Sequence, residues 1–218
     1  IHVSETKDEV DFSIKNYKQK PINFLDSIGL LTKRTVMAHG VWIDDEEMEI
    51  IGKRKSSLIY NPTSNLKLAV GKIFPYDKAK KYKVNVALGT DGSASNNNLD
   101  LLEEMKIGSL IQKYIQNNPT ALPAQEILDC ATINGARAFG LNSGKISVGK
   151  NADIALINMK DISLIPGHNL VSDLAYSASG SVISDLICNG LPIMLNRKVE
   201  NENRIISEFK KRSKNITK

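Results

Sequence analysis

Three polar residues have the types and the spacing that a catalytic metal site requires. His2, His39 and Asp91 stand at or just after the carboxyl ends of short apolar segments that are expected to be β-strands. In a closed βα barrel these strand ends converge on one mouth, so residues far apart in the sequence meet there. Two imidazoles and a carboxylate suit Zn²⁺ or Fe²⁺, and a catalytic ion needs a third protein ligand and an open position.

The spacing by itself leaves structural alternatives open for the same residues. A histidine near a strand end is more often a structural side chain than a metal ligand. Asp91 lies in a Gly-Thr-Asp-Gly run, and Asp-Gly is a common hairpin dipeptide. His168, the third histidine, follows Pro166 and Gly167 in an expected turn and has no neighbouring ligand.

Alternating apolar segments predict the elements that would position these residues. Strands are expected at 1–5, 35–39, 57–60 and 84–88, and helices at 6–19, 44–51, 77–82, 99–115 and 124–139. A loop is expected from Asn61 to Gly71, because Asn-Pro breaks regular structure. Asn96 to Asn98 are expected to cap the helix that begins near Leu99. Parallel strands need long crossovers, so this alternation predicts an α/β barrel or an open doubly wound sheet.

Beyond Gly140 the pattern changes. Glycines separate short expected strands such as 154–157 and 182–187, and this pattern predicts a small antiparallel β unit. A helix is expected at 202–211. We therefore expect a barrel segment at 1–140, a β-sandwich segment at 141–201 and a C-terminal helix and tail at 202–218.

Composition excludes several classes of protein. The 218 residues carry 29 Lys and Arg against 24 Asp and Glu, and 41% are hydrophobic, which predicts a folded chain. No stretch approaches the ~18 apolar residues of a membrane-spanning helix. Much of the net charge of +5 comes from Lys210 to Lys218, so a solvated end is a better explanation than a nucleic-acid-binding face.

Cysteine usage indicates the compartment. Cys130 and Cys188 lie far apart, with no second cysteine near either, which fits neither a metal clip nor a disulfide framework. The chain also opens without a basic and then apolar leader, which argues against secretion. The expected location is cytoplasmic.

Several segments, in this order, resemble the amidohydrolase superfamily. Within it they are most similar to the methylthioadenosine/S-adenosylhomocysteine deaminases and to related chlorohydrolase-type enzymes. The matching segments are 1–6 (IHVSET), 37–40 (MAHG), 61–68 (NPTSNLKL), 89–98 (GTDGSASNNN), 131–136 (ATINGA) and 144–153 (GKISVGKNAD). The resemblance extends to about Val199 and implies the C-terminal half of a TIM (β/α)₈ barrel, followed by a small β-sandwich segment and a terminal helix.

The resemblance also implies roles for five residues. His2 matches a metal-binding histidine, and Asp91 matches an aspartate that contacts the metal and accepts a proton from the attacking water. His39 matches a histidine that polarises the reacting centre. Glu5 matches a glutamate that binds the purine and passes a proton to its ring nitrogen, and Ser95 matches a serine near the base. The implied cofactor is one divalent ion, zinc in the first place and iron as the alternative.

The implied reaction is hydrolytic deamination of an adenine-type nucleoside or another heterocyclic small molecule. Two alternatives remain: a chlorohydrolase or guanine-deaminase-like activity, and a fragment that is inactive by itself and acts as a folding or oligomerisation module. Tyr60 stands where these deaminases commonly have a histidine, and Trp42 where some have a second one. Both aromatics are more often packing residues than recognition residues.

The length predicts that part of the barrel is missing. Residues 1–140 compare with ~250 for a complete barrel. The family's His-x-His pair is absent from the sequence, and Ile1 is not an initiator methionine, so the chain is expected to be a fragment that lacks the N-terminal half. The first and last strands of a half barrel would have unpaired edges. We therefore expect either the missing half or a second copy as a partner, and a homo-oligomer in the latter case.

Overall fold

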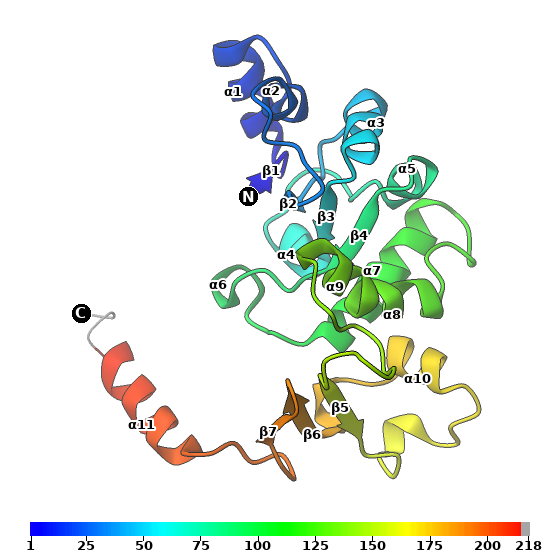
Figure 1. Cartoon of the computed structure of the whole chain (residues 1–218), viewed down its shortest axis with the longest axis vertical. Coiled ribbons are helices and arrows are strands. Elements are labelled where there is room, and N and C mark those ends of the chain that lie inside the picture. The colour runs from blue at the N-terminus through cyan, green and yellow to red at the C-terminus, as the bar shows by residue number, and fades with distance from the viewer. Residues whose placement is uncertain (215–218) are drawn as a thin grey trace.

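A computed structural model describes residues 1–214, so residues 215–218 of the expected tail lie outside the described part. Its centre is a four-stranded parallel sheet in the order β1-β2-β3-β4 (Figure 1). The strands are β1 (His2–Val3), β2 (Val36–His39), β3 (Ser57–Tyr60) and β4 (Asn85–Leu88). The expected α/β alternation with a parallel sheet is confirmed.

Helices connect the strands, and several of them begin at a residue whose side chain caps the first turn. They are α1 (Lys7–Tyr17), α2 (Pro21–Ser27), α3 (Asp45–Arg54), α5 (Tyr76–Lys81), α7 (Leu101–Ile115), α8 (Ala124–Ala131) and α9 (Ile133–Phe139). Thr6 caps α1 by accepting a hydrogen bond from the Glu9 N–H. Asp44 and Glu47 form a reciprocal capping box at α3. These caps satisfy N–H groups that have no partner within the helix.

Two local predictions around the third strand and the long helix were wrong. The expected loop at 61–71 contains α4 (Pro62–Lys67), because proline is favoured in the first turn of a helix, where its missing N–H costs nothing. Asn96 to Asn98 do not cap the long helix. Asp100 does, with its carboxylate accepting from the N–H groups of Leu102 and Glu103.

Two further helices differ from the expected pattern. The short helix α6 (Ser93–Asn96) follows β4, where no helix was expected. The single helix expected at 124–139 is divided into α8 and α9, because the backbone of Thr132 leaves the helical region at φ −130° and ψ −91°. The division lets α9 pack against β4.

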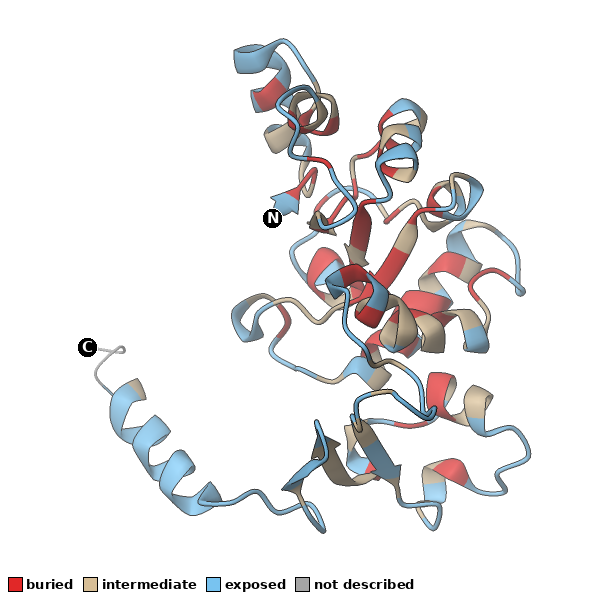
Figure 2. Cartoon of the chain, in the orientation of Figure 1, coloured by how far each residue is buried: buried red, intermediate tan, exposed pale blue. Residues whose placement is uncertain are grey.

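The two faces of the parallel sheet are buried to different extents. Met37, Leu58 and Val86 pair in register and so share one face, and all three belong to the hydrophobic core. On the other face Ala38, Ile59 and Ala87 pair in register, and of these Ala38 and Ile59 are only half-buried, whereas Ala87 is buried. Figure 2 shows buried residues gathered on the sheet and on the adjoining helices. One face of the sheet therefore lies under helices, while the other is incompletely covered.

The C-terminal region contains the expected small antiparallel sheet. It consists of β5 (Ile154–Ile157), β6 (Ile183–Cys188) and β7 (Leu191–Met194), paired in that order. Helix α10 (Leu170–Tyr176), which the pattern did not predict, packs against α7 and α8. The 3₁₀ turns η1 (Ile162–Leu164) and η2 (Gly180–Val182) help to bury a separate small core beside this sheet.

The terminal helix α11 (Glu202–Ser213) projects away from the rest of the molecule (Figure 1). It buries none of its residues, and Figure 2 shows it exposed along its length. Among residues 1–214, no helix combines the length and the apolar character needed to cross a membrane.

Candidate metal and catalytic site

The sheet brings His2, His39 and Asp91 together, and these three residues are called the strand-end cluster here. One potential ligand atom from each lies within 4.8 Å of the others. The two imidazole rings are stacked, with their centroids 5.3 Å apart and an interplanar angle of 26°. His39 is buried, Asp91 is half-buried and His2 is exposed. Residues separated by up to 89 positions therefore present their polar atoms to one point.

The backbone turns sharply at each of the strand ends that form the cluster. Ser4, His39 and Asp91 have positive φ angles of 50°, 72° and 61°. This left-handed region is uncommon for residues other than glycine, although His and Asp enter it more readily than most. Non-glycine residues held there gather at functional sites, where surrounding contacts maintain the conformation.

A glutamate on α1 fixes the turn that carries Glu5. The carboxylate of Glu9 accepts hydrogen bonds from the N–H groups of Ser4 and Glu5, both at 2.8 Å. Glu5 is half-buried, and its Oε2 lies 3.7 Å from Nε2 of His39. The Glu5 side chain therefore adjoins the cluster without belonging to its three closest ligand atoms.

Two serine hydroxyl groups hold the Asp91 carboxylate. Ser64 Oγ and Ser95 Oγ each donate to Asp91 Oδ2 at 2.7 Å. Partial burial acts to raise the pKa of Asp91, but these donors, the Gly92 N–H and the neighbouring His39 ring outweigh it, so the pKa lies below its ordinary value. Asp91 is therefore stabilised as a carboxylate, and both hydroxyl groups engage the same oxygen.

The site includes two residues to which the sequence reasoning gave no role. Ser64 and Asn65 lie on α4, in the NPTSN segment that follows β3. Ser64 contacts Asp91, and Asn65 Oδ1 lies 2.9 Å from Nδ1 of His39. The signal was present in the sequence, because this segment was among the motifs that carried the family resemblance. A loop prediction for this segment does not specify where its side chains lie, so their contacts with the cluster were not predicted.

The two aromatic departures from the family pattern have structural contacts. Tyr60 is 2% exposed, stacks on Phe74 with ring centroids 4.8 Å apart, and directs its hydroxyl toward the Gly108 carbonyl. The interpretation of Tyr60 as a core residue is thus confirmed. Trp42 is half-buried and donates its indole N–H to the Val70 carbonyl at 2.7 Å, which attaches the loop after α4 to the end of β2.

The donor set of the strand-end cluster fits a divalent transition metal. Neutral imidazole nitrogen and carboxylate oxygen are the usual ligands of Zn²⁺, and two imidazoles with one carboxylate also suit Fe²⁺. The stabilised carboxylate of Asp91 supplies the negative charge that such an ion needs. His168 is exposed in the bend after Gly167 and is not a member of the cluster.

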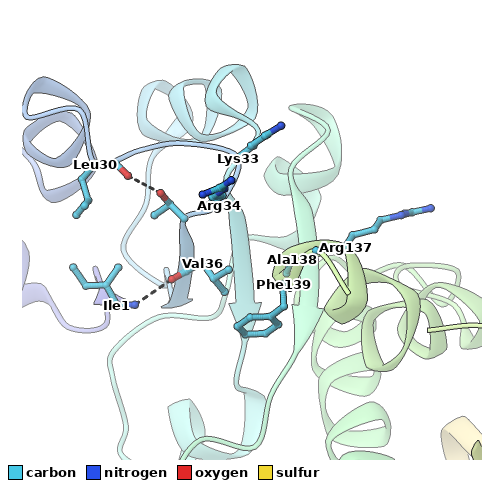
Figure 3. A pocket seen from close by; sticks show the side chains of 10 residues that line it. Ile1, Leu30, Lys33, Arg34, Val36, Arg137, Ala138 and Phe139 are labelled. Atoms are coloured by element: carbon cyan, nitrogen blue, oxygen red, sulfur yellow. Dashed lines mark hydrogen bonds between the residues drawn. The ribbon is translucent and has the colours of Figure 1, made fainter. Parts of the chain in front are cut away.

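A wide hollow lies away from the strand-end cluster. It has a volume of about 910 Å³ and is lined by Ile1 and Val36, at the amino ends of β1 and β2, and by Phe139 of α9 (Figure 3). No member of the strand-end cluster lines it. Because cluster residues occur at the carboxyl ends of β2 and beyond β4, we assign the chemistry to the cluster and not to this hollow.

The chain is similar to known proteins in both sequence and fold. The chain belongs to the amidohydrolase family, whose model matches residues 1–193. Among curated relatives, a 5'-deoxyadenosine deaminase of Methanospirillum hungatei is 48% identical over 94% of this chain and 46% of its own length. A 5-methylthioadenosine/S-adenosylhomocysteine deaminase of Archaeoglobus fulgidus is 43% identical over 100% of this chain and 52% of its own length.

A solved structure extends the comparison to three dimensions. An adenosine deaminase from Xanthomonas campestris with bound zinc superimposes with a TM-score of 0.94 at 34% identity, over 99% of this chain and 50% of that protein. The chain thus spans about half the length of the relatives that it matches. The relatives named here are all deaminases.

Proposed function

We propose that the protein is a metal-dependent hydrolytic deaminase of adenine-type nucleosides, of the class that includes 5'-deoxyadenosine and methylthioadenosine/S-adenosylhomocysteine deaminases. One observation carries the proposal: His2, His39 and Asp91 place ligand atoms within 4.8 Å of one another at the carboxyl end of the sheet. The sequence similarity to adenosine-type deaminases supports the choice of substrate class.

In this proposal His2 and Asp91 hold one divalent ion, zinc in the first place and iron as the alternative. When bound, such an ion lowers the pKa of a water molecule to about 7 and so makes hydroxide available at neutral pH. The arrangement of the other groups supports the choice. Ser64 and Ser95 both donate to Oδ2 of Asp91, so neither hydroxyl group competes with an ion for Oδ1.

Two side chains, those of Asp91 and Glu5, carry out the proton transfers of the reaction. Asp91 takes one proton from the water as its oxygen attacks the ring carbon that bears the amino group. Glu5 donates its proton to the adjacent ring nitrogen, which prevents negative charge from building up there. The proton on Asp91 then passes to the amino group, which leaves as ammonia. The hydroxyl proton of the adduct returns to Glu5 as the ring carbonyl forms, so all protons balance.

His39 and Ser95 orient the reactants in this scheme. Nε2 of His39 lies 3.7 Å from the Glu5 carboxylate, so a polar group placed between these side chains would contact both. Burial of the His39 ring, at 1% exposure, restricts its motion and favours a fixed direction for that contact. Ser95 stands beside the carboxylate, at the edge where the heterocycle would lie.

We also propose how the chain fits into the complete enzyme. Residues 1–140 would form the second half of a (β/α)₈ barrel, residues 141–201 part of a β-sandwich, and residues 202–218 a C-terminal helix and tail. Three features support a missing first half: the half-buried second face of the sheet, the single neighbour of β1 and of β4 in the described sheet, and the open hollow in Figure 3. A second copy of the chain is the alternative partner.

The test is an assay of the full-length protein against a substrate panel. 5'-Deoxyadenosine, methylthioadenosine, S-adenosylhomocysteine, guanine and a chlorinated triazine are supplied separately, and released ammonia and chloride are measured. We expect ammonia from the adenine nucleosides, and loss of that activity with retained metal in Glu5→Gln. Chloride release, or ammonia from guanine alone, would favour the alternative enzymes. The isolated chain is assayed beside it, and we expect turnover only when the complementary half is present.

A further inference from the structure

The segment 61–65 (NPTSN) contacts the candidate site, and beyond the contact of Ser64 with Asp91 the proposed reaction gives it no role. It spans the end of β3 and the first residues of α4, and α4 packs against α6 and α7. Ser64 and Asn65 are buried, at 0% and 6% exposure. One turn of this helix thus places two adjacent polar side chains against two different strand ends, those of His39 and Asp91.

The Asn65 amide faces the inner nitrogen of the His39 ring. Its Oδ1 lies 2.9 Å from Nδ1 of His39, while Asn61 Nδ2 lies at 3.5 Å from the same atom. One ring nitrogen cannot donate to Asn65 and accept from Asn61 at once, and the shorter contact has the better hydrogen-bond geometry. The Nδ1–H form of His39 therefore fits these contacts, with its proton directed at Asn65.

The other ring nitrogen then has a defined direction. With Nδ1 engaged by Asn65, Nε2 faces the Glu5 carboxylate at 3.7 Å. The hydrogen-bond partner of one imidazole nitrogen determines whether the other nitrogen carries a proton or a lone pair. Such partners usually fix both the tautomer and the orientation of the ring. Among residues 1–214 the buried amide nitrogen of Asn65 has no hydrogen-bond partner, so the hydrogen bond of this side chain there is the one between its Oδ1 and His39.

We propose that Asn65 is a positioning residue for His39. It accepts the Nδ1–H and so holds the ring with Nε2 directed at Glu5 and the reacting centre. The effect of Asn65 on turnover rests on the proposed function, whereas the hydrogen bond can be measured without any turnover.

The experiment uses the zinc-loaded full-length protein labelled with ¹⁵N-histidine. Long-range ¹H–¹⁵N correlation spectra distinguish the two tautomers, and the His39 signals are assigned by their loss in His39→Gln. We expect the Nδ1–H tautomer in the wild type and its loss in Asn65→Leu, with kcat reduced by about 10- to 100-fold and KM little changed. Asn65→Asp keeps an acceptor, so we expect it to retain the Nδ1–H signal and to recover most of kcat.

Asn85→Leu is the matched control. Asn85 is a partly buried asparagine at the amino end of the same sheet, where it donates to Ser57 and to the Asn134 carbonyl. We expect this variant to keep the His39 tautomer and both kinetic constants.

Three outcomes would overturn the proposal. They are an Nε2–H tautomer for His39 in the wild type, an unchanged tautomer in Asn65→Leu, and a loss of kcat in Asn65→Asp as large as in Asn65→Leu. If Asn65→Leu does not fold, the wild-type spectrum and Asn65→Asp decide. If the hydrogen bond is found but no adenine nucleoside is deaminated, the proposed function fails and the contact between Asn65 and His39 stands.

Discussion

Replacing Asp91 separates its chemical role from its structural role. The residue adopts φ 61° and accepts two hydroxyl groups at one oxygen, so the two replacements Asp91→Asn and Asp91→Ala have different consequences. Asparagine also enters the left-handed region readily, and its carbonyl oxygen can accept both hydroxyl groups. Alanine loses both hydrogen bonds and is strained at this φ.

The magnitudes follow from these contacts. Changing two hydrogen bonds from a charged to a neutral acceptor costs about 1–2 kcal/mol in Asp91→Asn, and partial exposure keeps the figure at the low end. Asp91→Ala loses both hydrogen bonds and adds about 1–2 kcal/mol for the left-handed backbone, which gives a total of about 2–4 kcal/mol. Loss of the proton acceptor is expected to lower kcat by at least about 10²-fold in both variants.

The assay combines urea unfolding, elemental analysis of zinc and ammonia release, all on the full-length protein. Because the pKa of Asp91 lies below 3.8, its ionised form contributes stability that is present above pH 3.8 and is lost as the pH falls further. The gap in stability between the wild type and Asp91→Asn should therefore shrink below pH 3.8. Asp91→Asn with full turnover and full metal content would refute the assigned role, and equal destabilisation by Asn and Ala would refute the backbone argument.

Three further predictions concern the frame around the site. Glu47→Ala should lower the free energy of unfolding by about 2–4 kcal/mol, because the buried carboxylate accepts two N–H groups, whereas Glu47→Gln should keep most of the stability in urea unfolding. Burial raises the pKa of Glu104 above 4.5, so its protonated form contributes to the free energy of unfolding at pH 4.5 and below. This contribution is lost as the pH rises through the raised pKa. Glu104→Gln should therefore show a smaller decline of the free energy of unfolding over that pH range. Gly108→Ala should lower the free energy of unfolding by about 1–3 kcal/mol, because its Cβ would lie 3.0 Å from the Tyr60 ring. Gly135→Ala should raise the melting temperature slightly, because the added Cβ would meet only open space.

Features encoded within a few neighbouring residues were predictable from the sequence. The strand Ser57–Tyr60 was expected at the bounds that the structure has, and Thr6 caps its helix as expected. Apolar runs and caps act over one or two turns of chain, so the sequence alone contains their cause. The residue types at positions 2, 39 and 91 similarly indicated metal chemistry before any fold was known.

Which of the site side chains lie close to one another was decided only by the tertiary structure. The contacts from Asn65 to His39 and from Ser64 to Asp91 span 26 and 27 positions, and they form because parallel pairing sets three strand ends side by side. The local pattern at Asn61 and Pro62 even indicated a loop, since the same dipeptide can end one element or begin the next. A sequence determines which side chains are available, whereas the register between strands determines which of them meet, and that register depends on the packing of the whole sheet.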